Sequence, residues 1–92
     1  MPDEPALREQ AQAAVRGGRL PARRHDRLWG GPGTGAVCVL CHRRIGREEN
    51  ELEMEFDRDR PGTDRYFIHP GCFAAWEFER MKGNGAMAAG QD

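Results

Sequence analysis

Apolar residues near the start of the chain recur at the spacing of an amphipathic helix. Pro5 and the acidic residues around it suit a helix N-terminus, and Gly17 and Gly18 suit its end. The sequence therefore predicts a helix over residues 3–16. Its apolar face would contain Leu7, Ala11, Ala14 and Val15.

In the second half of the chain, hydrophobic and polar residues alternate with the two-residue period of a β-strand. Residues 51–56 alternate strictly, with Leu52, Met54 and Phe56 on one face and three glutamates on the other. This alternation is typical of a half-buried strand. A turn at Pro61–Gly62 and a short apolar run over 66–68 complete a predicted hairpin.

A second helix is predicted over residues 70–81. Pro70 suits its first turn, Phe73 and Trp76 share a face that we expect to be core, and Gly83 would end it. Residues 83–92 are then expected to form a disordered tail.

The chain divides into four parts on this interpretation. They are an N-terminal amphipathic helix (1–17), a connector rich in Arg and Gly (18–35), a unit of hairpin and helix (36–82) and the tail (83–92). The connector is expected to be extended or turned. The predicted fold class is a small α+β protein: a β-hairpin and a helix, preceded by another helix.

Composition explains why such a chain would need a metal. Only 38% of its 92 residues are hydrophobic and 32% are charged, with a mean hydropathy of −0.81. A short chain with so little apolar material usually requires a disulfide, a metal or a partner. No apolar run is long enough for a membrane span, and the acidic, polar N-terminus does not resemble a signal peptide. We therefore expect a cytoplasmic protein.

Cysteine and histidine spacing supplies the candidate metal site. The pair Cys38-x2-Cys41 is followed, after 27 intervening residues, by His69-x2-Cys72. Two closely spaced pairs separated by a hairpin are typical of a tetrahedral zinc site, and thiolate and imidazole donors suit zinc. His42 competes with His69 as the fourth ligand, and a redox role for Cys38 and Cys41 is the main alternative to metal binding. Four protein ligands would make the zinc structural, so we expect no enzyme and no small-molecule substrate.

The order of zinc knuckle, β-hairpin and helix in residues 36–82 resembles the treble-clef zinc fingers, so we expect a treble-clef-like zinc finger there, preceded by the N-terminal helix. Within that group, residues 36–80, with Phe73 beside the last ligand, look like the finger of poly(ADP-ribose) polymerases and DNA ligase III. This resemblance implies zinc on the four residues named above and binding to DNA breaks. The whole chain is also similar to a group of small proteobacterial zinc-binding proteins, through residues 18–21, 29–35 and 69–80.

Charge is unevenly distributed and leaves two kinds of partner open. Residues 1–44 carry eight arginines against four acids, whereas residues 45–92 carry six basic residues against eleven acids. The favoured hypothesis is a zinc-stabilised module that binds another protein or has a regulatory role. The alternative is binding of DNA or RNA through the connector, and a thiol redox sensor is a third hypothesis. The connector residues concerned are Arg19, Arg23, Arg24, Arg27 and Trp29.

Overall fold

The computed structural model describes the backbone of residues 4–91 and the side chains of residues 6–82. Its elements follow in the order α1 (Glu4–Arg16), β1 (Arg27–Pro32), β2 (Asn50–Asp57), β3 (Thr63–Ile68) and α2 (Pro70–Gln91). This is a small α+β fold, as predicted. None of the described helices combines the length and the hydropathy that a bilayer span requires.

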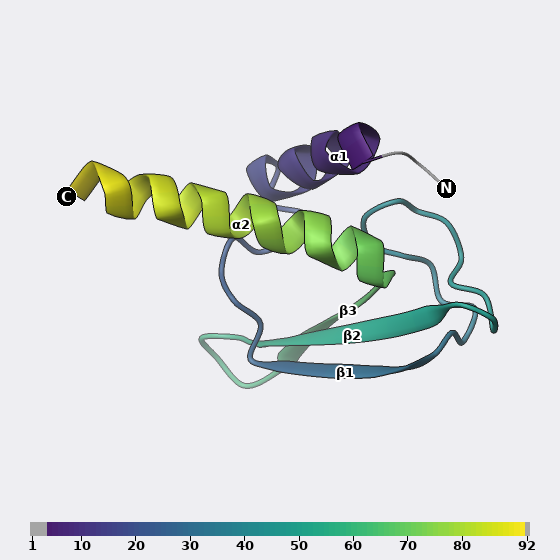
Figure 1. Ribbon diagram of the computed structural model, residues 1–92. Coiled ribbons are helices and arrows are strands. Elements are labelled where there is room, and N and C mark those ends of the chain that lie inside the picture. The colour runs from purple at the N-terminus through teal and green to yellow at the C-terminus, as the bar shows by residue number, and fades with distance from the viewer. Residues whose placement is uncertain (1–3, 92) are drawn as a thin grey trace.

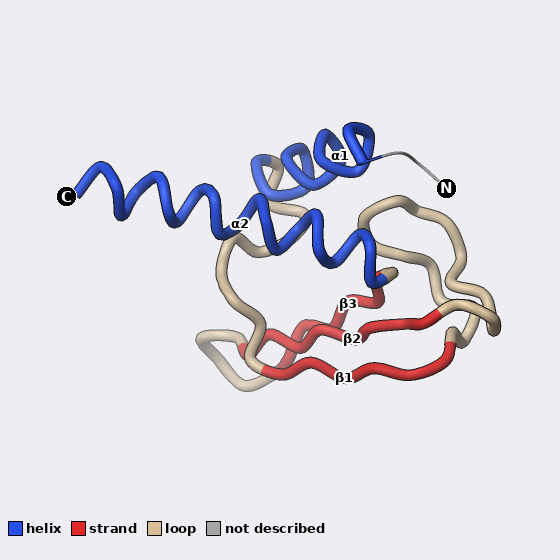
Figure 2. Tube along the Cα trace, viewed as in Figure 1, coloured by secondary structure: helices blue, strands red, loops and turns tan. Residues whose placement is uncertain are grey.

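The three strands form one antiparallel sheet in the order β1-β2-β3. Figures 1 and 2 show α2 lying across one face of this sheet and α1 lying against α2. The inner face of the sheet carries Met54, Phe56 and Ile68, which are almost completely buried against Trp76. The alternation in residues 51–56 is thus confirmed: the apolar set of β2 faces the helix.

The hairpin prediction was incomplete, because the connector contains a third strand. β1 pairs with β2 over its whole length, from Arg27 opposite Glu55 to Pro32 opposite Asn50. All six of its residues are exposed, and Gly30, Gly31 and Pro32 have low strand propensity. Its strand character therefore comes from pairing with β2, and no local pattern indicates it.

The second helix is also longer than predicted. It passes through Gly83 and ends at Gln91, so residues 83–91 are helical where we expected a disordered tail. Three alanines beyond Gly83 are strong helix formers and offset the glycines. The predicted start at Pro70 is confirmed. The first helix begins at Glu4; Asp3 lies outside the described residues.

At Gly33 the backbone of the connector lies close to the backbone of residues 45–49. Its N–H donates to the carbonyl of Glu49 at 2.9 Å, and a Cβ added to Gly33 would lie 2.0 Å from the carbonyl oxygen of Gly46 and 2.7 Å from that of Ile45. Both neighbours are backbone atoms, which cannot rotate away. The glycine-rich segment thus lets the chain lie flat against the segment that follows Cys41.

Replacing Gly33 with alanine is expected to destabilise the fold by about 2–3 kcal/mol, because overpacking against backbone cannot relax cheaply. Thermal unfolding followed by circular dichroism would show a midpoint lowered by at least about 10 °C. Gly31→Ala is the matched control, since a Cβ there meets open space. Equal melting of the two variants would refute this explanation of Gly33.

Candidate metal centre

A tight turn presents Cys38 and Cys41 to the same point. Val37 and Arg44 form an isolated antiparallel bridge, and the N–H of Cys38 donates to the carbonyl of Arg43 at 2.8 Å. Within the turn, the N–H of His42 donates to the carbonyl of Cys38 at 3.0 Å. These bonds hold the two thiols on the inner side of the turn.

The other two side chains come from the junction of β3 and α2. His69 follows the last residue of β3, and Cys72 lies in the first turn of α2. A hydrogen bond of 2.8 Å from the N–H of Val39 to the carbonyl of Phe67 joins the Cys38–Cys41 turn to the edge of β3. The sheet edge therefore sets the distance between the two halves of the site.

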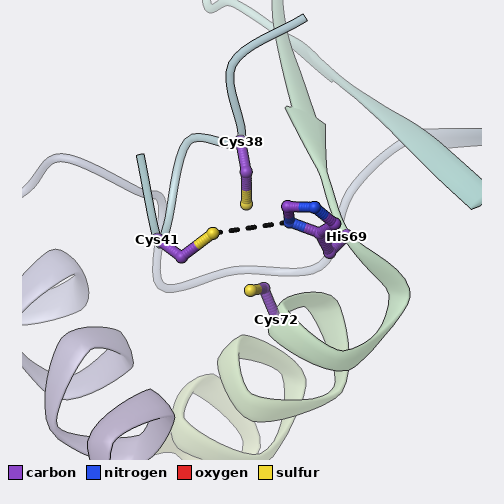
Figure 3. A group of neighbouring side chains, drawn as sticks. All are labelled: Cys38, Cys41, His69 and Cys72. Atoms are coloured by element: carbon purple, nitrogen blue, oxygen red, sulfur yellow. Dashed lines mark hydrogen bonds between the residues drawn. The ribbon is translucent and has the colours of Figure 1, made fainter. Parts of the chain in front are cut away.

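The four side chains converge, as Figure 3 shows. The donor atoms of Cys38, Cys41, His69 and Cys72 all lie within 4.8 Å of one another, and all four residues are buried. Cys41 Sγ is 3.4 Å from His69 Nδ1, so Nδ1 is the nitrogen that faces the thiols. The three cysteines are free thiols.

The size and chemistry of this cluster fit a zinc ion. Zn–S and Zn–N bonds of about 2.3 and 2.0 Å in a tetrahedron separate the donors by about 3.5–3.8 Å. The separations seen here, up to 4.8 Å, require contraction of about 1 Å or less. Three sulfurs and one imidazole favour zinc over oxygen-seeking cations.

The thiols are electrostatically coupled. A hydrogen bond from the Cys72 thiol lowers the pKa of Cys38, and backbone amides of Cys41, His69 and Leu40 lower it further. The same contact with Cys38 and burial raise the pKa of Cys72. The Cys38 thiolate thus forms readily, whereas ionisation of Cys72 needs a cation to offset the negative charge already present.

His42 does not join the cluster. Its side chain is exposed, and its backbone has a positive φ of 67°. It lies in the left-handed conformation that turns the chain after Cys41. The structure therefore brings His69 to the thiols and leaves His42 at the surface.

Glu49 supports His69 from the side away from the thiols. Its Oε1 lies 3.4 Å from His69 Nε2 and accepts the Gly46 N–H at 2.8 Å. The Gly46 amide is the main cause that lowers the pKa of Glu49, which keeps the carboxylate charged. A carboxylate on the outer nitrogen of a ligating histidine fixes its tautomer and its ring orientation. No motif or ligand spacing in the sequence indicates Glu49, because only the fold of the loop after Cys41 brings it to His69.

Replacing Glu49 with glutamine is expected to weaken zinc binding by about 10–100-fold, because His69 loses its charged partner. Competition with a chromogenic chelator would measure the zinc dissociation constant. The neighbouring substitution Glu48→Gln removes the same charge from an exposed residue without an ion pair to His69. Equal zinc affinities for the two variants would contradict the role of Glu49.

A cavity of about 270 Å³ opens beside the cluster. His69 and Cys72 form part of its wall, together with Leu7, Arg43 and Glu49. The site is therefore buried but reachable by a small solute from the side where α1 meets the start of α2.

Most of the connector arginines bond to other groups of this chain. Arg19 donates to the carbonyl of Val39, Arg23 donates to the carbonyl of Asp57 at 2.7 Å, and Arg27 pairs with Glu55 at 2.7 Å. Arg24 is exposed, and Trp29 is 55% exposed on the outer side of the sheet. These five residues do not form one cluster at the metal centre, and their binding of nucleic acid stays a prediction.

Comparisons of the chain with protein-family models, curated proteins and solved structures give no match.

Proposed function

We propose that Cys38, Cys41, His69 and Cys72 hold one zinc ion, and that this ion is structural. The observation that carries the proposal is the convergence of four buried donors of zinc-binding type from two separate segments. Four protein ligands fill a tetrahedral zinc, so no position stays open for a substrate or a reactive water. The knuckle, the antiparallel strands and the helix that supplies Cys72 also support a treble-clef type of finger.

Zinc would provide stability that the small hydrophobic core cannot provide alone. The ion would tie the Cys38–Cys41 turn to the end of β3 and to the first turn of α2, the three segments that meet at the cluster. Structural zinc contributes about 10–16 kcal/mol of apparent binding energy to folding. Such a site needs reduced thiols, which favours a reducing compartment such as the cytoplasm.

With this zinc-stabilised fold, the protein would act as an interaction or regulatory module and would not act as an enzyme. All three thiols and His69 are directed at the metal site, which leaves little for nucleophilic catalysis. Large apolar side chains remain on the surface, including Trp29, Phe78 and Met81. Exposed aromatic and methionine side chains are enriched where proteins meet.

The bonds that the connector arginines already make within the chain favour a protein partner over nucleic acid. Arg23 and Arg27 contact acidic residues of this chain, and Arg19 donates to a backbone carbonyl. A phosphate contact would first require these bonds to break. DNA or RNA binding therefore stands as the second proposal.

Affinity capture with the zinc-loaded full chain tests the interaction role. A protein partner should be retained after nuclease treatment and lost when the metal is removed by chelation. Capture that disappears with nuclease would favour the nucleic-acid alternative, and absence of any partner would count against an interaction module.

A further inference from the structure

The outer face of the sheet, opposite α2, carries two cross-strand rows of side chains. One row is Arg27–Glu55–Arg65, and the next is Trp29–Glu53–Phe67, as the strand register shows. Side chains directly opposite on neighbouring strands have Cβ atoms about 4.5–5.5 Å apart. Glu53 and Glu55 of β2 thus each lie between a residue of β1 and a residue of β3.

The carboxylate of the first row is paired with an arginine on each side. Arg27 Nε lies 2.7 Å from Glu55, and Arg65 Nε lies 3.0 Å from the other oxygen of the same carboxylate. Glu51 lies on the other side of Glu53 from Glu55. It accepts hydrogen bonds from the N–H and the hydroxyl of Thr34 at 3.1 and 2.8 Å. These two glutamates are buried, with 8% of each exposed.

Glu53 differs from its two neighbours. Its ion pair is with Arg65, at 3.7 Å, and Arg65 lies closer to Glu55. The Glu53 side chain is 27% exposed. Among the three glutamates of β2, it is therefore the one that keeps capacity for a further cation.

Aromatic residues stand opposite Glu53 on both neighbouring strands. Trp29 is 55% exposed, and it contributes to the lowered pKa of Glu55 after the larger effect of Arg27. Phe67 is partly buried at the opposite end of the row. Tryptophan gives the strongest cation–π attraction of the natural side chains.

We propose that Trp29, Glu53 and Phe67 bind a lysine or arginine side chain from a basic segment of a protein partner. The inference rests on the proposed interaction function and names the chemistry of its partner. Charge complementarity selects the occupant: this face carries four carboxylates (Glu51, Glu53, Glu55, Asp57) against two guanidinium groups (Arg27, Arg65). The same charge repels the phosphates of nucleic acid.

Fluorescence anisotropy with a labelled peptide of alternating lysine and alanine tests the assignment on the zinc-loaded full chain. Wild type should bind this peptide in a salt-sensitive manner and should not bind a glutamate–alanine peptide. Trp29→Ala and Glu53→Gln should each weaken binding about two- to fivefold, the range for an exposed cation–π contact or ion pair. The double variant should weaken it about tenfold.

Glu9→Gln is the matched control, because Glu9 is an exposed residue of α1, which lies on the other side of α2 from the sheet (Figure 1). Equal binding of the peptide by wild type, Trp29→Ala and Glu53→Gln would overturn the assignment, as would preference of wild type for a duplex oligonucleotide.

The capture experiment separates the two proposals. If wild type and the double variant retain a partner equally, the proposal for this surface is refuted, whereas the proposed interaction function still stands. No partner for wild type would refute the interaction function itself.

Discussion

Replacing Cys72 with serine is expected to abolish zinc binding and to unfold the region from the cysteine turn to α2. Serine removes one of three sulfur donors, and the apparent binding energy of structural zinc, about 10–16 kcal/mol, matches or exceeds the net stability of a typical domain. The remaining thiols, Cys38 and Cys41, would then be crowded without a cation. Circular dichroism under reducing conditions, together with zinc content, would measure both losses.

Val37→Ser is the matched control for this substitution. Val37 is next to Cys38, is 50% exposed and supplies no donor to the cluster. It should keep stoichiometric zinc and melt within a few degrees of wild type. A Cys72→Ser protein that still unfolds cooperatively at a similar temperature would show that the fold does not depend on the metal.

Replacing Trp76 with alanine is expected to destabilise the protein by about 3–5 kcal/mol, the usual cost of removing a buried aromatic side chain. Trp76 is completely buried, packs edge-on against Phe56 with centroids 6.0 Å apart, and donates its indole N–H to the carbonyl of Pro21 at 2.9 Å. It therefore joins α2 to both the sheet and the connector. Thermal melts of the zinc-loaded protein should show a midpoint lower by more than about 12 °C.

Trp29→Ala serves as the comparison, because Trp29 is the other tryptophan and is 55% exposed. Its removal should cost about 0.5 kcal/mol or less. Similar losses of stability for the two variants would mean that Trp76 does not anchor the core.

The metal cluster could be predicted from the sequence because ligand spacing is a local property. Each ligand pair, Cys38 with Cys41 and His69 with Cys72, is separated by two residues. This short spacing lets a local turn direct both side chains to one ion, whatever the rest of the fold. The choice of His69 over His42 also agrees with the structure. The inward face of β2 followed from strict alternation in the same local way.

Features that depend on tertiary pairing were missed. β1 contains two glycines and a proline, and it becomes a strand through its register with β2. Glu49 reaches His69 because the loop after the cysteine turn folds back, which no spacing rule indicates. The sequence also does not indicate that Arg27, Arg65 and Thr34 bind two of the three β2 glutamates, Glu55 and Glu51.

The most direct test of the central claim is X-ray absorption at the zinc edge of the freshly purified full chain. The account predicts one zinc per chain, with three sulfurs at about 2.3 Å and one nitrogen at about 2.0 Å. A protein without stoichiometric zinc, or a first shell of oxygen donors, would contradict the assignment of Cys38, Cys41, His69 and Cys72 as the ligands of a structural ion.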